Sequence, residues 1–390
     1  MTTVKQGSSS LFTSITESFS QHYLSLPTCV GRAPGRVNII GEHTDYNEGF
    51  VLPAAMDRNI FIAGKLRDDD IINLWSLDYN AIASFTLDKL QDKDLPAWSS
   101  YLRGVLWVLQ SKGHTLQGMD IASLGNVPLA GGFSSSAAAE VAMFELSCGL
   151  LGIEMTQTQK ALLGVEVENR FIGVPSGAMD QLISALGQAD HAILIDCRSL
   201  ATTPIRLPHG VTLLALDTGK RRALLNSEYG VRRKQCEEAA RLLGVKALRD
   251  VTPEQLAARA HKLPELIERR AAHVVNENAR TLAAVDALKS GDLAKVGKLM
   301  DESHVSLRDL YEVSITELDV MAALVQSEKG CYGARMMGGG FGGAVIALVD
   351  DGAVERITAT VGEAYDAATH LKAFIYPVKA GAGSGVELVK

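Results

Sequence analysis

Apolar residues recur at two periods along the chain, and together they predict a mixed α/β protein. Helical spacing predicts an amphipathic helix followed by a loop within residues 10–27, and a region of helices over about 229–326 with breaks near 251–253 and 291. Further helices are predicted over about 100–110, 157–170 and 354–368. Short apolar runs predict strands at 60–63, 71–76, 119–123, 191–196, 211–217 and 344–349.

The clearest helix signal begins at Ser134, where SSSAAAEVAMFELSCGLL follows a loop rich in Gly and Pro. Serines suit a helix start, and the alanines and long apolar residues that follow favour helix. A second break, VPSG at 174–177, precedes another helical segment, MDQLISALG. The two breaks place polar residues just before or within a first helical turn.

The composition shifts near residue 200 from a mixed, Gly-rich α/β pattern to a helix-rich one. We expect two domains, residues 1–205 and 206–390, with a Gly-rich tail whose apolar end can pair back onto a sheet. The 390 residues are 47% hydrophobic and 21% charged, which is typical of a well-cored globular protein. The net charge of −7 and the absence of a basic stripe argue against nucleic acid or a membrane as partner.

Five scattered cysteines without CxxC spacing predict free thiols in a reducing compartment. The N-terminal segment has no secretory pattern, and no run of eighteen apolar residues occurs. We therefore expect a cytoplasmic, enzyme-like protein.

Two glycine-rich loops are candidate phosphate sites. In PLAGGFSSSAA, glycines allow close approach, the following helix offers free N–H groups, and Ser134 to Ser136 add hydroxyls for phosphate or Mg²⁺. The alternative is a linker with an N-cap serine, and the lysine of a Walker A loop is missing. In GGGFGG (338–343) a strand rather than a helix follows, so a phosphate contact and a close chain crossing remain equally open.

Two carboxylates flank the VPSG break. Glu168 lies near the end of one helix and Asp180 at the start of the next, so both could face one cavity. Phosphoryl transfer uses such a pair, one carboxylate for Mg²⁺ and one to orient or deprotonate the attacking hydroxyl. The alternatives are a dipole-stabilised first-turn acid and a solvated helix face.

The stretch GRVNIIGEHTDYNEG carries Arg36 and a cluster of Glu42, His43 and Asp45. A metal site is disfavoured because the spacing lacks HExxH and the chain has only nine histidines. Solvated loop charges are a second possibility. Recognition of a polyol is the third, because carboxylates and imidazole supply the acceptors and donors that paired hydroxyls need.

These stretches resemble the motifs of one family. GRVNIIGEHTDYNEGFVLP resembles the galactokinase signature, whereas PLAGGFSSSAAAEVA and RMMGGGFGGAVIALV resemble the second and third motifs of the GHMP small-molecule kinases. GAMDQLISALG resembles the segment with the galactokinase catalytic aspartate. The resemblance implies a two-domain fold: an N-terminal domain like ribosomal protein S5, a helix-rich ferredoxin-like C-terminal domain, and an active site in the cleft between them.

The resemblance also implies roles for individual residues in ATP-dependent, Mg²⁺-dependent formation of galactose 1-phosphate by a monomeric enzyme. Asp180 would be the base or orienting group, and Arg36 would offset charge on the phosphoryl group. Trp98 would lie beside the adenine, unless it is a partly buried core aromatic. The sugar would contact Arg36, Glu42, His43, Asp45, Ser176, Gly177, Asp180 and Tyr229. The ATP phosphates would contact Gly131, Gly132, Ser134, Ser135, Ser136 and Ala137, and Mg²⁺ would be held by Ser136 and Glu168.

Some residues depart from the usual pattern of the family. Ser176 and Ala178 replace a common Cys and a larger apolar residue near the sugar, Phe133 replaces Leu, and Met337 replaces Thr. Two alternative functions follow: a kinase for a uronic acid or an amino sugar, and a galactose sensor without catalysis. The acidic 42–49 region argues against a uronic acid, and the intact serine–alanine loop argues against a sensor.

Overall fold

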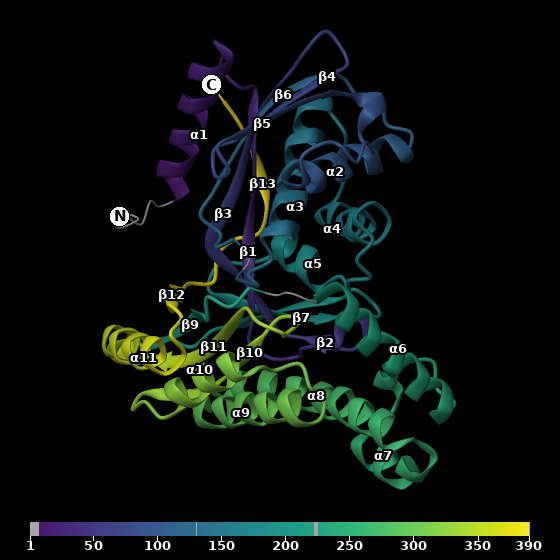
Figure 1. Cartoon of the computed structure of the whole chain (residues 1–390), viewed down its shortest axis with the longest axis vertical. Helices are drawn as coiled ribbons and strands as arrows, with labels where there is room; N and C mark the ends of the chain where they lie inside the picture. The colour runs from purple at the N-terminus through teal and green to yellow at the C-terminus, as the bar shows by residue number, and fades with distance from the viewer. Residues whose placement is uncertain (1–7, 130, 222–224, 390) are drawn as a thin grey trace.

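The computed structural model describes residues 8–129, 131–221 and 225–389, which build three β-sheets and eleven α-helices in that part of the chain (Figure 1). The largest sheet has the strand order β13-β1-β3-β6-β4-β5 and is antiparallel except between β4 and β6. Its strands are β1 (Cys29–Asn38), β3 (Pro53–Leu66), β4 (Ile71–Ser76), β5 (Ala81–Thr86), β6 (Met119–Gly125) and β13 (Gly385–Leu388).

Helices cover both faces of this sheet. Helix α1 (Ser8–Tyr23) packs Ile15 and Phe19 against Val30 of β1 and its neighbours on one face. Cys29, the adjacent strand residue, belongs to the larger core on the other face, as the two-residue period of a strand requires. That second face carries α2 (Ser100–Ser111), α3 (Ser135–Leu151), α4 (Gln157–Glu166) and α5 (Met179–Leu186).

A second body of structure holds the remaining elements. Its four-stranded sheet has the order β10-β11-β9-β12, formed by β9 (Val211–Asp217), β10 (Cys331–Met337), β11 (Ala344–Asp350) and β12 (Phe374–Val378). The helices are α6 (Leu225–Leu243), α7 (Pro253–Arg259), α8 (Glu265–Ser290), α9 (Leu293–Asp309), α10 (Thr316–Gln326) and α11 (Val354–Thr369). A small third sheet contains β2 (Phe50–Val51), β7 (His191–Asp196) and β8 (Thr202–Arg206).

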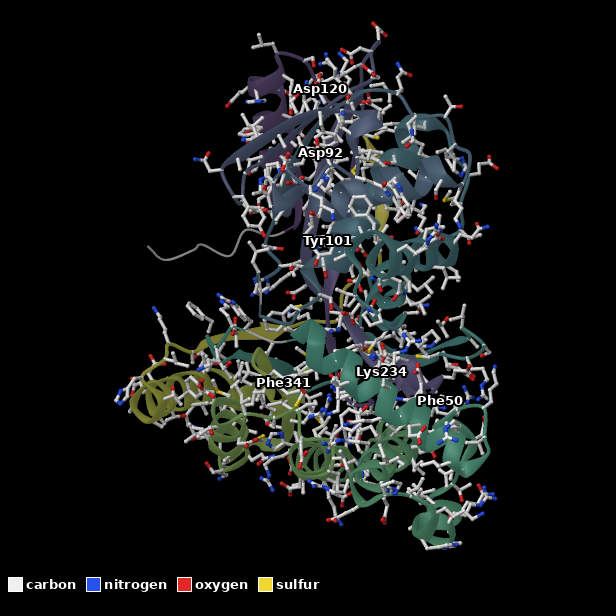
Figure 2. All side chains as sticks on the ribbon, turned by 45° about the vertical axis from the view of Figure 1, so that its right-hand side comes forward. Phe50, Asp92, Tyr101, Asp120, Lys234 and Phe341 are labelled. Carbon is white, nitrogen blue, oxygen red and sulfur yellow. The ribbon has the colours of Figure 1, made fainter. Side chains whose placement is uncertain are left out.

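The chain crosses between these bodies early. In Figure 2, Tyr101 marks the upper part of the molecule, whereas Phe50 and Phe341 mark the lower part. Strand β2, which follows β1 by only a short loop, packs against α8 in the lower part. The segment between β1 and β2 therefore lies where both halves of the chain can hold it.

All strands predicted from apolar runs are present, but six further strands were missed. They are β1, β2, β5, β8, β10 and β12. Strand β1 reads CVGRAPGRVN, and its glycine has a packing reason: a Cβ on Gly31 would lie 2.2 Å from the Ala142 carbonyl oxygen of α3. A Cβ on Gly333 of β10 would similarly lie 2.1 Å from the Gly297 carbonyl oxygen of α9. Close backbone contact selects glycine there, which weakens the local strand pattern.

The C-terminal tail pairs with the first strand of the chain. Strand β13 joins β1 antiparallel, with Cys29 opposite Leu388. All five cysteines are free thiols. Among the helices that the structure describes, none is both long and apolar enough to cross a membrane.

Candidate active site

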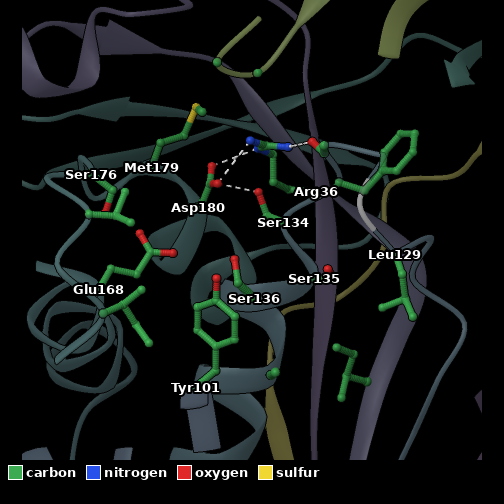
Figure 3. Close-up of a pocket in the computed structure, with 18 of the residues that line it drawn as sticks. Arg36, Tyr101, Leu129, Ser134, Ser135, Ser136, Glu168, Ser176, Met179 and Asp180 are labelled. Carbon is green, nitrogen blue, oxygen red and sulfur yellow. Dashed lines mark hydrogen bonds and ion pairs between the residues drawn. The ribbon is translucent and has the colours of Figure 1, made fainter. Parts of the chain in front are cut away.

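A cleft of about 500 Å³ gathers most of the candidate residues (Figure 3). Strands β1, β3, β4 and β6 contribute to its lining, as do the loop after β1, the start of α2 and the turn before it, and α6. The starts of α3 and α5, the break between α4 and α5, and the second glycine loop complete it. The candidate residues that line it are Arg36, Glu42, His43, Asp45, Trp98, Gly132, Ser134, Ser135, Ser136, Glu168, Ser176, Gly177, Asp180 and Tyr229.

Arg36 and Asp180 form the central ion pair of the cleft. The Arg36 guanidinium donates from Nε to Asp180 Oδ1 at 2.9 Å and from Nη2 to Oδ2 at 3.1 Å. The Ser134 hydroxyl also donates to Asp180 Oδ2, as Figure 3 shows. This bidentate pairing fixes the plane of the carboxylate and compensates its charge. Asp180 remains accessible, because its side chain keeps 30% of its surface exposed against 5% for Arg36.

Three structural features place the group formed by Arg36, Ser134 and Asp180. The β1–β3 register shifts between Pro34 and Arg36, which is a bulge that redirects the strand. The Arg36 side chain donates to the Gly132 carbonyl, so it joins the strand to the glycine loop. Asp180 occupies the first turn of α5, where a carboxylate is favoured by the helix dipole.

The start of α3 points at the same space. Ser134 precedes the helix in the left-handed region with φ of 55°, and Gly132 has φ of 86°. The first N–H groups of an α-helix lack intrahelical partners, so those of α3 can meet an anion. The Ser135 and Ser136 side chains line the cleft, whereas Ala137 is buried and can contribute only through its backbone. Gly131 is buried behind the cleft, where a Cβ would lie 2.7 Å from Asp217 Oδ2.

A group of carboxylates lies on the other side of Ser136. Glu168 comes from the π-helical turn at Val167–Ile172. Burial together with the nearby Asp180 charge raises its pKa to about 7, although the neighbouring polar side chains of Ser176, Gln181 and Ser136 act to lower it. Glu140, fully buried on α3, accepts from Gln181 at 3.1 Å, and burial raises its pKa well above the usual value. The site therefore holds more acidic groups than cations.

This arrangement fits a hard divalent cation. Mg²⁺ prefers oxygen ligands and usually takes one or two carboxylates together with substrate phosphates. The Glu168 carboxylate and the Ser136 hydroxyl provide such oxygens, and a cation would offset the charge that raises the pKa of Glu168. Among the described residues, no group of three or more His, Cys, Asp or Glu side chains is arranged to hold a metal ion. Oxygen atoms of a bound phosphate would therefore have to complete the coordination of a cation here.

The acidic loop, defined here as residues 41–49, forms the opposite end of the cleft. The Glu42 carboxylate is buried, and its Oε1 accepts the Gly338 N–H at 2.8 Å and lies 3.1 Å from Arg335 Nη2. His43 has φ of 61°, and its Nδ1 lies 2.8 Å from the Tyr46 hydroxyl. These contacts turn both side chains toward the interior, so the alternative of solvated loop charges does not describe Glu42 and His43.

Asp45 and Gly177 meet across the cleft. A Cβ on Gly177 would lie 2.0 Å from Asp45 Oδ2, so only glycine allows this approach. Burial, with the Asp180 charge as a second cause, raises the pKa of Asp45 to about 6. Tyr229 of α6 closes this end, with its ring 5.6 Å from that of His43. The result is a compact pocket of alternating acceptors and donors.

Trp98 lies in the short 3₁₀ turn Ala97–Ser99 that precedes α2, and it lines the cleft. Its ring stacks on that of Tyr79 with centroids 6.2 Å apart, and both residues line the cleft. Trp98 is half-buried and packs against the main core, as the alternative of a partly buried core aromatic expects, and its contact with adenine stays a prediction.

Sequence reasoning missed several residues of the site. Tyr101 lines the cleft and points toward Ser136 in Figure 3, and burial raises its pKa to about 12. Its segment, SYLRGVLWVLQ, reads only as a helix. Gln181 adjoins Asp180 in sequence and could have been suggested by that neighbour. Arg335 and Glu277 both contact Glu42, which lies 235 or more positions away in the sequence. The sequence pattern holds no signal for contacts of this separation.

The departures from the family pattern have simple structural settings. Phe133 is buried, with its ring 6.0 Å from that of Tyr376. Met337 is buried beneath β1, and its sulfur accepts the Asn38 N–H at 3.2 Å. Gly338 and Gly339 line the cleft, while a Cβ on Gly340 would lie 2.2 Å from the Val313 carbonyl oxygen. The second glycine loop thus combines close packing with support of Glu42.

Family comparisons cover most of the chain. Residues 17–66 match the galactokinase galactose-binding signature, residues 100–188 match the GHMP kinase N-terminal domain, and residues 284–367 match the GHMP kinase C-terminal domain. A galactokinase of Roseiflexus sp. (strain RS-1) is 45% identical over 374 residues, which are 95% of each chain.

Solved structures agree. The crystal structure of Lactococcus lactis galactokinase complexed with galactose matches with a TM-score of 0.92 and 33% identity, covering 96% of this chain and 99% of that one. Methanococcus jannaschii mevalonate kinase matches with a TM-score of 0.58 and 18% identity, over 90% of this chain and 98% of that one. The second match concerns the fold alone, and both agree with the two-domain fold expected from the motifs.

Proposed function

The chain belongs to the galactokinases, within the GHMP kinases, and we propose that it transfers the γ-phosphoryl group of ATP to the anomeric hydroxyl of α-D-galactose. The observation that carries this proposal is the junction at Asp180. One accessible carboxylate, held by Arg36 and Ser134, lies between an acidic hydroxyl-binding pocket and a helix N-terminus suited to phosphate.

In this proposal Asp180 receives or orients the proton of the anomeric hydroxyl. The carboxylate keeps its plane through the bidentate Arg36 contact, so one oxygen can face the sugar while the ion pair persists. Arg36 lies between this carboxylate and the Gly132 carbonyl of the glycine loop, and its charge would offset negative charge on the transferring group.

The N–H groups at the start of α3 and the hydroxyls of Ser134 to Ser136 would hold the ATP phosphates. Ser136 and Glu168 would hold Mg²⁺, which neutralises phosphate charge when bound. Positioning and charge stabilisation supply the catalysis, because phosphoryl transfer needs little covalent chemistry from the protein.

The first test combines a sugar panel with a variant of Asp180. ATP turnover should be supported by galactose and less well by galacturonic acid or galactosamine. Asp180→Asn should lower kcat by about 10²–10⁴-fold, the usual contribution of a proton-transfer group. Asp190→Asn, at an exposed carboxylate outside the cleft, is the matched control. Turnover with another sugar but not galactose would refute the substrate, and near-full activity of Asp180→Asn would refute its role.

The second test concerns the acidic loop. Glu42→Ala should raise the galactose KM by about tenfold or more, since a charge-assisted hydrogen bond contributes about 1.5–3 kcal/mol. The ATP KM should change little, because Glu42 lies at the sugar end of the cleft. Steady-state kinetics with each substrate varied in turn provide the measurement. An equal rise in both KM values would contradict a sugar-facing loop.

A further inference from the structure

The acidic loop belongs to the first part of the chain, but the residues that hold its backbone come from the last third. Helix α8 lies against it, and four side chains spaced along one face of that helix reach residues 41–50 or their immediate surroundings. These residues are His273, Glu277, Asn278 and Thr281.

Glu277 is the centre of this contact. Its carboxylate is fully buried, and Oε1 accepts three donors: the Gly41 N–H at 2.9 Å, the Glu42 N–H at 3.3 Å and the Ser303 hydroxyl at 2.7 Å. The second oxygen accepts Arg280 Nε–H at 2.9 Å. A buried carboxylate is costly unless such donors surround it, so rotation of the peptide units at Gly41 and Glu42 would remove two of its four donors and is disfavoured.

His273 holds the other side of the same peptide. Burial lowers the pKa of His273 to about 3, so the ring is neutral. Its Nε2 lies 3.1 Å from the Glu42 carbonyl oxygen, which can only accept, so Nε2 carries the proton. Nδ1 then accepts from the Ser306 hydroxyl at 2.9 Å. Both the N–H and the C=O of Glu42 are therefore fixed by α8.

The Glu42 side chain is fixed by a second group from the same part of the chain. Arg335 of β10 is fully buried, and its Nη1 donates to the Asn38 carbonyl at 2.8 Å while Nη2 lies 3.1 Å from Glu42 Oε1. The Gly338 N–H meets that same carboxylate oxygen. With the backbone and Oε1 both held, the direction of the other carboxylate oxygen, Oε2, is set before any ligand arrives.

We propose that Glu277 is a positioning residue for galactose recognition, which fixes the Gly41–Glu42 peptide so that Glu42 Oε2 is preset toward a sugar hydroxyl. The inference rests on the proposed function, because it takes Glu42 as a galactose contact. In this proposal residues of the C-terminal half hold the backbone of the sugar-binding loop, whereas the N-terminal half supplies Arg36, Asp180 and the start of α3. Preorganisation of this kind lowers the ordering cost of binding.

The test measures galactose binding by calorimetry without nucleotide, together with the ATP KM. Glu277→Gln keeps the size of the side chain, but its amide turns an N–H either toward the loop amides or toward Arg280. We expect the galactose Kd to rise about tenfold or more, with the ATP KM within about twofold. Glu265→Gln, exposed in the first turn of the same helix, is the control and should change neither.

A double-mutant cycle distinguishes positioning from a general structural role. If Glu277 acts through Glu42, Glu277→Gln should weaken galactose binding much less in a Glu42→Ala background than in the wild type. Additive effects, or an unchanged galactose Kd in folded Glu277→Gln, would overturn the inference. If Glu277→Gln does not fold, Ser303→Ala removes one donor from the same oxygen, and an unchanged galactose Kd there would also overturn it.

Failure of the proposed function gives a different result. In that case the wild-type protein itself shows no galactose binding and no galactose-dependent ATP turnover. The wild-type measurement therefore separates the two failures before any variant is compared.

Discussion

Asp45 illustrates how single residues of the pocket depend on their surroundings. Its carboxylate lies against Gly177, where any side chain would collide with it, and close enough to Asp180 for the two charges to repel. Burial and this repulsion together raise the pKa of Asp45 to about 6. A residue that would ionise near pH 4 in water thus titrates close to neutrality.

The raised pKa of Asp45 predicts a pH dependence of stability. The folded state binds the Asp45 proton more tightly than the unfolded chain, whose Asp45 pKa is 3.8. The free energy of unfolding therefore contains the full contribution of this proton below pH 3.8 and loses it as the pH rises through about 6. A shift of this size is worth on the order of 3 kcal/mol. Asp45→Asn stays neutral at all pH values and lacks this loss.

Thermal unfolding between about pH 5 and 7.5 provides the measurement for this prediction. The difference in Tm, Asp45→Asn minus wild type, should increase as the pH rises across this range. Asp94→Asn, at an exposed carboxylate, should follow the wild-type curve. Parallel curves for Asp45→Asn and the wild type would show that Asp45 ionises at an ordinary pH.

At the scale of elements, the start of α3 combines local and tertiary requirements. Ser134 adopts a left-handed conformation that is unfavourable for a residue with a Cβ, and its hydroxyl donates to Asp180 of another helix. A glycine would meet the first requirement but not the second. The serine run therefore does more than begin a helix, because Ser134 also connects α3 to α5 at the Asp180 carboxylate.

Ser136 gives the prediction that belongs to this element. Ser136→Ala should raise the Mg²⁺ concentration for half-maximal rate by about tenfold, because one proposed oxygen ligand is lost. Mg²⁺ titration at saturating ATP and galactose measures it. Ser147→Ala is the control on the same helix, since its hydroxyl is buried without a hydrogen-bond partner among the described residues. An unchanged Mg²⁺ requirement in Ser136→Ala would exclude it as a ligand.

At the scale of the whole molecule, the C-terminal tail adds the edge strand of the largest sheet. Strand β13 covers the edge of β1, the Gly383 N–H donates to the Gly187 carbonyl at 2.7 Å, and the Ser384 hydroxyl donates to Glu145 at 2.6 Å. Glu145 is itself buried and paired with Lys160. The last residues of the chain are thus tied to strands and helices formed much earlier in sequence.

Removal of residues 380–390 should destabilise the protein. The truncation exposes the edge of β1 and leaves one buried Glu145 oxygen without its donor, so the Tm should fall by about 5 °C or more. Thermal unfolding and size-exclusion chromatography measure the loss of stability and any edge-to-edge association. Ser384→Ala should lower the Tm less than the truncation does. An unchanged Tm after truncation would show that the tail is only peripheral.

Much of the fold and the site could be predicted where the signal is local. Strands such as β4, β7 and β9 are apolar runs with the bounds predicted, and the helix after Ser134 begins within one residue of its predicted start. Strands β1 and β10 were missed because helices approach their backbones and require glycine. The π-helical turn that carries Glu168 was also missed, because its geometry depends on packing against α2.

The sequence alone determined the chemistry of this protein: its motifs identify the family, and the residue types at Arg36, Ser136 and Asp180 suit phosphoryl transfer. The tertiary structure decided how those groups are held. The hydrogen bond from Ser134 to Asp180 and the contacts of Glu42 with Glu277 and Gly338 join residues 46 to 296 positions apart. Such contacts leave no periodic trace, because a buried charge is stabilised by whatever donors the fold brings to it.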